Sequence, residues 1–162
     1  MLIKLKNNTT LIVDDFKFKC CVGKNGLRSN KREGDKCTPK GKFKIGNLYY
    51  RPDKVKKPFT KINIKQIKKN MGWCDDSFSK GYNKQIDINK NTKGEKLYRN
   101  DYKYDYLIVI EYNTRKVRPH KGSAIFLHLT KNYEKTAGCI AVSKKDFLII
   151  IKIINKNSKI II

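Results

Sequence analysis

The chain has 162 residues, of which 39% are apolar, and its 38 Lys and Arg against 14 Asp and Glu give a formal net charge of +24. This length fits one domain, and the apolar share is enough for a packed interior. No repeat and no Pro-, Gly- or Ser-rich linker divides the chain, so we expect a single domain over residues 1–162.

The excess of positive charge attracts anions, so nucleic acid, anionic lipid and an acidic polymer such as the bacterial wall are candidate partners. Lys dominates, however: only six of the 38 basic residues are Arg, at positions 28, 32, 51, 99, 115 and 118. Nucleic-acid readers usually depend on the bidentate fork of Arg. Since the Lys residues are spread along the whole chain, we favour a compositional bias and expect no specific nucleic-acid partner.

The N-terminal residues 1–8 alternate apolar and basic types and lack the continuous apolar region of a secretory signal. The longest apolar run, residues 147–151, is too short to span a bilayer. We therefore expect a soluble chain with no transmembrane segment. The oligomeric state is left open.

The cysteines are odd in number, so at least one is free or paired outside the chain. They are Cys20, Cys21, Cys37, Cys74 and Cys139. No C-x-x-C pair occurs, and the two histidines, His120 and His128, are far from the first three cysteines. This pattern argues against a structural zinc site, and we expect no metal and no organic cofactor. Cys37, in the turn before a proline, is predicted to be exposed.

Alternation of apolar and polar residues predicts strands at residues 2–6, 11–13, 16–22 and 43–50. The stretch 23–41 is typical of a loop, and its Thr38-Pro39-Lys40-Gly41 ending is typical of a turn. Residues 51–99 lack a clear period and predict a long insertion with little regular structure, of the kind that is often functional.

Strong apolar runs predict strands at residues 104–112, 123–129 and 139–142. The second is apolar on both faces, which indicates a central strand. Ser143 with Asp146 forms a capping box that opens a helix over residues 144–155, and a last strand covers 158–162. We expect a mainly β fold, a sandwich or open barrel of antiparallel and mixed strands with one main helix near the C-terminus.

One histidine and one cysteine could together form a base and a nucleophile. His128 lies near the end of one apolar strand, and Cys139 begins the next. If these strands pair antiparallel, opposed residues lie about 5 Å apart at Cα, within reach of a sulfur–imidazole hydrogen bond. Imidazole can take the thiol proton and stabilise the thiolate, while Gly138 lets the backbone turn sharply and present N–H groups to an oxyanion. From the pattern alone, a buried cysteine and a core histidine are the favoured interpretation over a catalytic pair.

Two segments, GSAIFLH at 122–128 and TAGCIAV at 136–142, resemble the active-site stretch of the L,D-transpeptidase (YkuD-like) catalytic domain, in a compact branch with histidine and cysteine close in sequence. Further stretches resemble the family in the same order: REGD at 32–35, TPKGKF at 38–43, GWCDD at 72–76, YN at 82–83 and EYN at 111–113. The resemblance runs from about residue 22 to the C-terminal strand.

The resemblance implies an acyltransferase that cuts after the third residue of a peptidoglycan stem peptide. The cysteine attacks that carbonyl, the terminal D-alanine leaves, and an amine of a second stem takes the acyl group to give a 3→3 cross-link. On this chain, Cys139 becomes the nucleophile, His128 the general base and then acid, and Gly138 part of the oxyanion site. A backbone carbonyl near Leu129 would orient the imidazole. The family's usual place is the periplasm or cell envelope, with the cytoplasm as the alternative.

Four residues are candidates for substrate binding: Trp73, Asp75, Tyr112 and Asn113. Trp73 could line a cleft, and Asp75 with Asp76 could bind the amine of a diamino acid. The alternative is an aromatic anchor that fixes a long loop, with surface acids beside it. Tyr112 and Asn113 end a strand near the catalytic pair, and strand-end hydrogen bonding is their other interpretation. His120 and the Lys31–Arg32 pair are expected to be solvated.

Two departures from the family pattern bear on the reaction. Many members have histidine before the glycine–cysteine pair and a polar or basic residue two after the cysteine, where this chain has Ala137 and Ala141. The acceptor is therefore open, and an L,D-carboxypeptidase or muropeptide hydrolase is one alternative. The other is a non-catalytic basic module that binds anionic polymer or nucleic acid, although no helix-turn-helix, zinc-finger or RNP-like sequence occurs.

Overall fold

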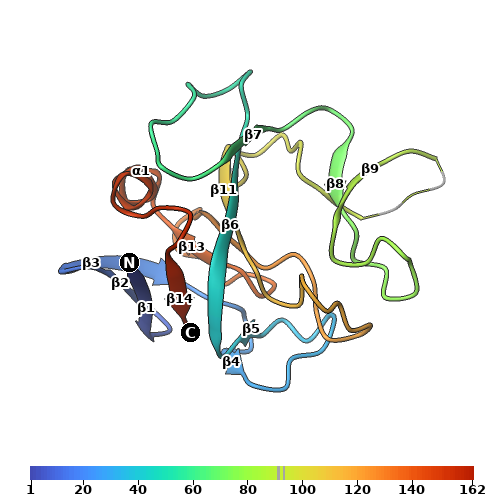
Figure 1. The fold of residues 1–162 in the computed structure, drawn as a ribbon, viewed down its shortest axis with the longest axis horizontal. Helices are drawn as coiled ribbons and strands as arrows, with labels where there is room; N and C mark the ends of the chain where they lie inside the picture. Colours follow the sequence, from blue (N-terminus) through green and yellow to red (C-terminus); the bar gives the residue numbers. More distant parts are fainter. Residues whose placement is uncertain (91, 93) are drawn as a thin grey trace.

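The computed structural model describes residues 1–90, 92 and 94–162. Its main sheet closes on itself because β6 pairs with both β14 and β11, which makes an eight-stranded barrel (Figure 1). In order around the barrel, the strands are β11 (Tyr106–Ile110), β12 (Phe126–Leu129), β13 (Ile140–Val142), β3 (Phe16–Cys21), β2 (Thr10–Val13), β1 (Leu2–Asn7), β14 (Lys159–Ile161) and β6 (Lys42–Tyr50). The predicted mainly β fold is confirmed, and the barrel is closed by the β6–β11 pairing.

The barrel is mixed. β1 pairs parallel to β14 and β12 pairs parallel to β13, whereas the other neighbours in the ring are antiparallel. A short strand, β7 (Ile64–Gln66), adds parallel to β6, and β4 (Leu27–Arg28) pairs with β5 (Thr38–Pro39) in the predicted loop 23–41. Each of the predicted barrel strands is present, with boundaries shifted by one to three residues.

Alternation along the strands sends every second side chain into the main core. Leu127 and Leu129 of β12 belong to this core, as do residues of β1, β2, β3, β6, β11, β13 and β14. The helix α1 (Lys144–Ile153) packs its buried residues Phe147, Ile150 and Ile151 into the same core. As predicted, the Ser143 side chain caps the helix by accepting from the backbone N–H of Asp146, at 3.1 Å.

The opposite face of β11 and β12 carries a second core, which a small sheet covers. That sheet has the order β10–β8–β9, with β8 (Met71–Trp73) between β9 (Gln85–Asp87) and β10 (Glu95–Lys96). Figure 1 shows β8 and β9 on one side of β6 and α1 on the other. The prediction of little regular structure over residues 51–99 was therefore wrong for β7–β10; residues 91 and 93 lie outside the described residues. Strands of two or three residues leave no readable alternation, which is why they were missed.

The strands that bring His128 and Cys139 together run parallel, so the antiparallel pairing considered above was wrong. Leu127 lies opposite Ile140 and His128 opposite Ala141. The polar connection after Leu129 returns along the barrel instead of turning back at once. A strand that is apolar on both faces is typical of parallel pairing, and this feature of β12 was visible in the sequence.

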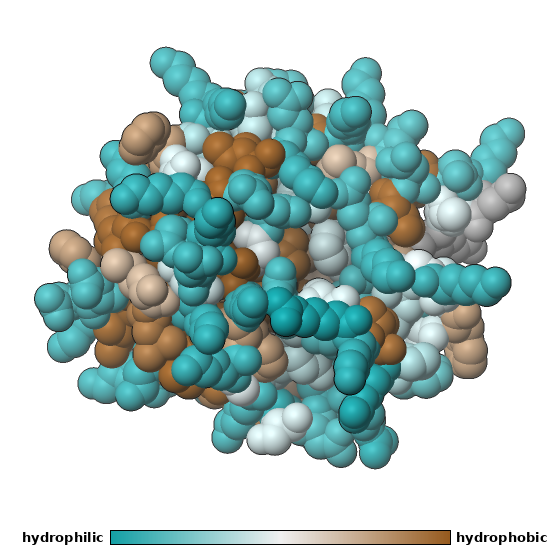
Figure 2. All heavy atoms as spheres, viewed as in Figure 1, coloured by the Kyte–Doolittle hydropathy of each residue, from teal (hydrophilic) through white to brown (hydrophobic). Residues whose placement is uncertain are grey.

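Hydrophilic side chains cover most of the face shown in Figure 2, with smaller apolar areas between them. This distribution agrees with Lys residues spread along the whole chain rather than gathered in one tract. Of the helices in the described part of the chain, none has the length and apolar character needed to cross a membrane.

Candidate active site

Cys139 stands directly before β13 and belongs to the second core, with only 7% of its surface exposed. Its sulfur accepts from the backbone N–H of Phe126 at 3.3 Å and donates to the carbonyl oxygen of Ala124 at 3.2 Å. Burial, and next the negative charge of Glu95, raise the pKa of the thiol. The thiol is therefore protonated at rest and needs a base before it can act as a nucleophile.

His128 is buried in β12, and its ring is fixed on one side. Nδ1 lies 2.8 Å from the carbonyl oxygen of Leu129, the orienting contact expected from the sequence. Because a carbonyl can only accept, Nδ1 carries the proton and Nε2 is the basic nitrogen. Burial lowers the pKa of His128 from 6.5 to about 4, so the imidazole is neutral near pH 7.

The register places both side chains on one face of the barrel wall. His128 lies opposite Ala141, and Cys139 is two residues earlier on the same side of the neighbouring strand. Strand spacing and rise then put their Cα atoms about 8 Å apart. In this state the thiol donates to Ala124 and not to the imidazole. The resting pair is thus a neutral thiol and a neutral imidazole.

Gly138 has φ +145°, a conformation that L side chains rarely adopt. A Cβ there would lie 2.9 Å from the carbonyl oxygen of Cys37 and 3.4 Å from Cδ1 of Ile125. Its N–H donates to Thr136 Oγ1 at 3.1 Å, so this donor is already engaged and is not free for an oxyanion in this state. Glycine is required here for close approach of two backbone segments beside the sulfur.

We expect Gly138→Ala to lower the free energy of unfolding by about 3 kcal/mol, through backbone strain plus the clash with Cys37. Gly34→Ala is the matched control, because Gly34 also has positive φ (+75°) but nothing within 4 Å of its added Cβ. The control should lose about 1 kcal/mol. Denaturant unfolding of both variants measures the difference, and equal losses would mean that the close approach is unimportant.

Trp73 is buried, packs edge-on against Phe126 and Tyr49 with ring centroids 5.3 and 6.4 Å away, and borders a cavity of about 280 Å³ that is separate from His128. Its indole N–H donates to Asn83 Oδ1 at 2.9 Å, and the same oxygen accepts from the backbone N–H of Ala124 at 3.0 Å. Trp73 therefore acts as the anchor that the alternative interpretation described, and Asn83 links it to the residue whose carbonyl touches the thiol.

The other three candidates for substrate binding differ in their surroundings. Asp75 is exposed as a residue, but partial burial of its carboxyl group and the negative charges of Glu33 and Asp76 raise its pKa. A cation bound nearby would therefore stabilise the carboxylate. Tyr112 donates its hydroxyl to the carbonyl oxygen of Lys121 at 2.5 Å. The Asn113 side chain bonds to Arg118 and Gly122, which orders the loop between them. These bonds order the loop, and Tyr112 and Asn113 also border a cavity of about 290 Å³, so their substrate-binding role stays a prediction.

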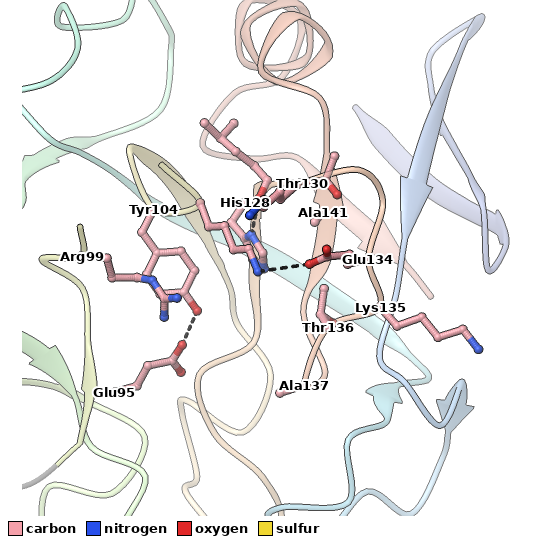
Figure 3. A pocket seen from close by; sticks show the side chains of 13 residues that line it. Glu95, Arg99, Tyr104, His128, Thr130, Glu134, Lys135, Thr136, Ala137 and Ala141 are labelled. Carbon is pink, nitrogen blue, oxygen red and sulfur yellow. Dashed lines mark hydrogen bonds and ion pairs between the residues drawn. The ribbon is translucent and has the colours of Figure 1, made fainter. Parts of the chain in front are cut away.

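A cavity of about 210 Å³ opens over the imidazole (Figure 3). Ala137 and Ala141 line it, two residues before and two after Cys139, so the departures from the family pattern lie in its wall. Six charged side chains also line it: Glu95, Arg99, Lys103, Lys131, Glu134 and Lys135. The cavity is large enough for part of a peptide and meets the candidate base directly.

Two residues of this cavity were not predicted, Tyr104 and Glu95. Tyr104 is buried just before β11, with its ring edge-on to His128 at 5.1 Å between centroids, and its hydroxyl donates to Glu95 Oε1. Glu95 is held in β10 by pairing with Trp73. No sequence signal connects them to Cys139, since the contact arises only when the small sheet closes over the barrel.

Two expectations about exposure were wrong. Lys31 is 3% exposed and forms an ion pair with Asp35 at 2.7 Å, so it is not a solvated lysine. Cys37 is 2% exposed because the turn before Pro39 folds beneath Gly138. All five cysteines, which lie within the described residues, are free thiols and buried. Over residues 1–90, 92 and 94–162, no cluster of three or more His, Cys, Asp or Glu side chains is arranged to hold a metal ion.

Comparison with protein families yields one match that covers nearly the whole chain. The family model of the YkuD L,D-transpeptidase catalytic domain matches residues 2–162. No curated protein and no solved structure matches the chain.

Proposed function

Because the chain belongs to the YkuD family of L,D-transpeptidase catalytic domains, we propose that it is an active cysteine acyltransferase that forms 3→3 cross-links between peptidoglycan stem peptides. Cys139 is the nucleophile and His128 the base. The observation that carries the proposal is their placement on one face of the barrel wall, with His128 lining a cavity that part of a peptide can enter.

The first half-reaction forms an acyl-enzyme. The S–H proton of Cys139 moves to Nε2 of His128, and the sulfur attacks the carbonyl carbon after the third stem residue. The carbonyl electron pair moves to oxygen and returns as the C–N bond breaks. The leaving amine of D-alanine takes the proton from Nε2. The donor bond from Nδ1 of His128 to the carbonyl oxygen of Leu129 leaves Nε2 as the nitrogen that takes and returns the proton.

The second half-reaction consumes the thioester. An acceptor amine loses a proton to Nε2 as its nitrogen attacks the thioester carbon, and the thiolate leaves and regains that proton. Water in place of the amine would give hydrolysis. Ala137 and Ala141 offer no polar side-chain group to the acceptor, so the choice between amine and water depends on the other residues that line the cavity.

The experiment incubates purified protein with a defined tetrapeptide stem, alone and with an acceptor stem, and identifies products by mass spectrometry beside Cys139→Ala. We expect loss of terminal D-alanine and a joined dimer in the wild type only. Loss of D-alanine without a dimer would replace the transpeptidase with a carboxypeptidase that uses the same nucleophile. If the wild type gives no product and no thioester, the catalytic proposal is wrong, and salt-dependent binding to anionic polymer becomes the next test.

We propose that the protein acts in the periplasm or cell envelope, where its proposed substrate lies. The strongly positive charge supports this place, because stem peptides and wall polymers carry negative charge. Cell fractionation with an antibody tests it: the protein should be found with the envelope fraction, and recovery only with the cytoplasm would favour a hydrolase of free muropeptides.

A further inference from the structure

The hydroxyl of Tyr104 donates to Oε1 of the half-buried Glu95. Tyr104 and Cys139 belong to the same buried core, and Phe126 contacts both of them: its ring packs edge-on against Tyr104 at 5.9 Å between centroids, and its backbone N–H donates to the sulfur at 3.3 Å. Tyr104 also lines the cavity over His128, so the phenol borders the space that a substrate would enter. Figure 3 shows the ring of Tyr104 beside His128, with Glu95 at its hydroxyl end.

The position of this phenol is strongly constrained. Its ring packs edge-on against His128 and Phe126, with centroids at 5.1 and 5.9 Å, and Arg99 lies over its face at 4.9 Å. These contacts come from β12 on one side and from the segment after β10 on the other. A side chain held from both sides can direct one hydroxyl hydrogen between two acceptors without moving its ring.

Glu95 and Tyr104 act on the sulfur in opposite directions. The negative charge of Glu95 raises the pKa of the thiol, whereas a hydrogen bond from Tyr104 lowers it. Lys31 also lowers that pKa through its charge. Burial in turn raises the pKa of Glu95, because it disfavours the charged carboxylate. This carboxylate accepts the hydrogen bond of the Tyr104 hydroxyl and so competes with the sulfur for that bond.

We propose that Tyr104 is a third catalytic residue, whose hydroxyl turns from Glu95 to the sulfur as Cys139 loses its proton to His128, and that Glu95 is the positioning residue that holds this hydroxyl in place beforehand. The proposal deepens the function proposed above and rests on the same nucleophile. No proton leaves Tyr104. Its O–H bond stays intact, and only the acceptor of its hydrogen bond changes from a carboxylate oxygen to the thiolate.

This arrangement leaves the thiol of Cys139 protonated and unreactive at rest, and it still stabilises the thiolate at the moment of attack. A hydrogen bond to a charged acceptor is stronger than one between neutral groups, so the phenol gains when sulfur becomes negative. The backbone N–H of Phe126 already points at the sulfur and provides a second donor. Together the two donors offset part of the cost of forming a thiolate in a buried site.

The test compares the alkylation rate of Cys139 by iodoacetamide in Tyr104→Phe, Glu95→Gln and the wild type, at one pH below the thiol pKa. Mass spectrometry of the peptide that contains Cys139 separates it from the other four cysteines. Below that pKa the rate follows the thiolate fraction. We expect Tyr104→Phe to react about tenfold more slowly and Glu95→Gln about threefold faster.

The control variant is Tyr98→Phe. Tyr98 also donates its hydroxyl to a carboxylate, Asp53 Oδ2 at 3.0 Å, but it is not among the groups that shift the pKa of the Cys139 thiol. Its rate should equal that of the wild type. Thermal melting of each variant checks folding, and Glu95→Gln alone still tests the proposal if Tyr104→Phe does not fold.

Opposite changes in the two variants would support the proposal, because a merely structural role would change both rates in the same direction. Equal rates in all variants, including no reaction in any, or slower reaction in both, would overturn it. The readout needs no stem peptide. If the peptide assay fails while the opposite rate changes occur, the function proposed above is wrong and the role of Tyr104 stands.

Discussion

Replacing His128 by Gln is expected to slow acylation of Cys139 by about 10²–10⁴-fold, the usual contribution of a positioned general base. The thiol is protonated at rest because burial raises its pKa, so it depends on an external base. Gln fills similar space and can keep a hydrogen bond to the carbonyl of Leu129, but it cannot accept a proton. Single-turnover formation of the thioester, followed by rapid quench and mass spectrometry, measures the rate.

His120→Gln is the matched control, because His120 is exposed and its ring contacts Phe78 rather than the cavity. This variant should acylate at the wild-type rate. A His128→Gln enzyme that acylates as fast as the control would show that another group removes the thiol proton, and the role given to His128 would be wrong.

The same substitution should change how stability depends on pH. The unfolded chain protonates histidine near its ordinary pKa of 6.5, whereas folded His128 does so only at about 4. Between these values the unfolded state binds more protons, so the free energy of unfolding falls as pH is lowered from 6.5 to about 4, by about 3 kcal/mol in all. Denaturant titrations should show this loss in the wild type and a smaller one in His128→Gln. Parallel curves would contradict the burial of a neutral imidazole.

Asn83→Ala should lower the free energy of unfolding by about 3–5 kcal/mol and also slow acylation. One buried side chain accepts from Trp73 and Ala124 and donates to the carbonyl oxygens of Tyr112 and Asn113. Its removal leaves these four groups without this partner. One of them is the backbone N–H of Ala124, the residue whose carbonyl oxygen accepts the hydrogen bond of the Cys139 thiol. Denaturant unfolding and thioester formation measure the two effects.

Asn132→Ala provides the comparison, because Asn132 shares the left-handed backbone (φ +53° against +55° for Asn83) but is exposed. It should lose only the cost of placing Ala in that conformation, about 1 kcal/mol. If both variants lose the same amount, the hydrogen bonds of Asn83 contribute nothing, and its link between the small sheet and the thiol is not important for stability.

Local patterns predicted the barrel strands and the helix because each side chain of those elements has a fixed direction. The alternation at Phe16, Phe18 and Cys20 and the spacing of Phe147, Ile150 and Ile151 contain the period directly. The direction of the β12–β13 pairing was wrong because it depends on the path of the connection, which no period describes. The short strands β8–β10 were missed because their pairing comes from tertiary packing.

The sequence predicted the site residues whose chemical type suggests catalysis. It did not predict the residues that matter only because folding brings them close to the site. Cys139 and His128 are the residues that nucleophilic catalysis needs, and their nearness in sequence drew attention. Tyr104, Glu95 and Asn83 act through contacts between β10, the segment before β11 and the segment before β12, and these exist only after folding. Cys37 and Lys31 were expected in solvent because their loop is polar, yet that loop folds beneath Gly138.

The most direct measurement of the central claim is a search for a thioester on Cys139. Protein is mixed with tetrapeptide stem without acceptor, quenched in acid, and its intact mass and the mass of the peptide containing Cys139 are determined. The account predicts an added mass equal to the stem without its terminal D-alanine, on Cys139 in the wild type and absent in Cys139→Ala. No adduct on the wild type, or an adduct that persists in the variant, would contradict it.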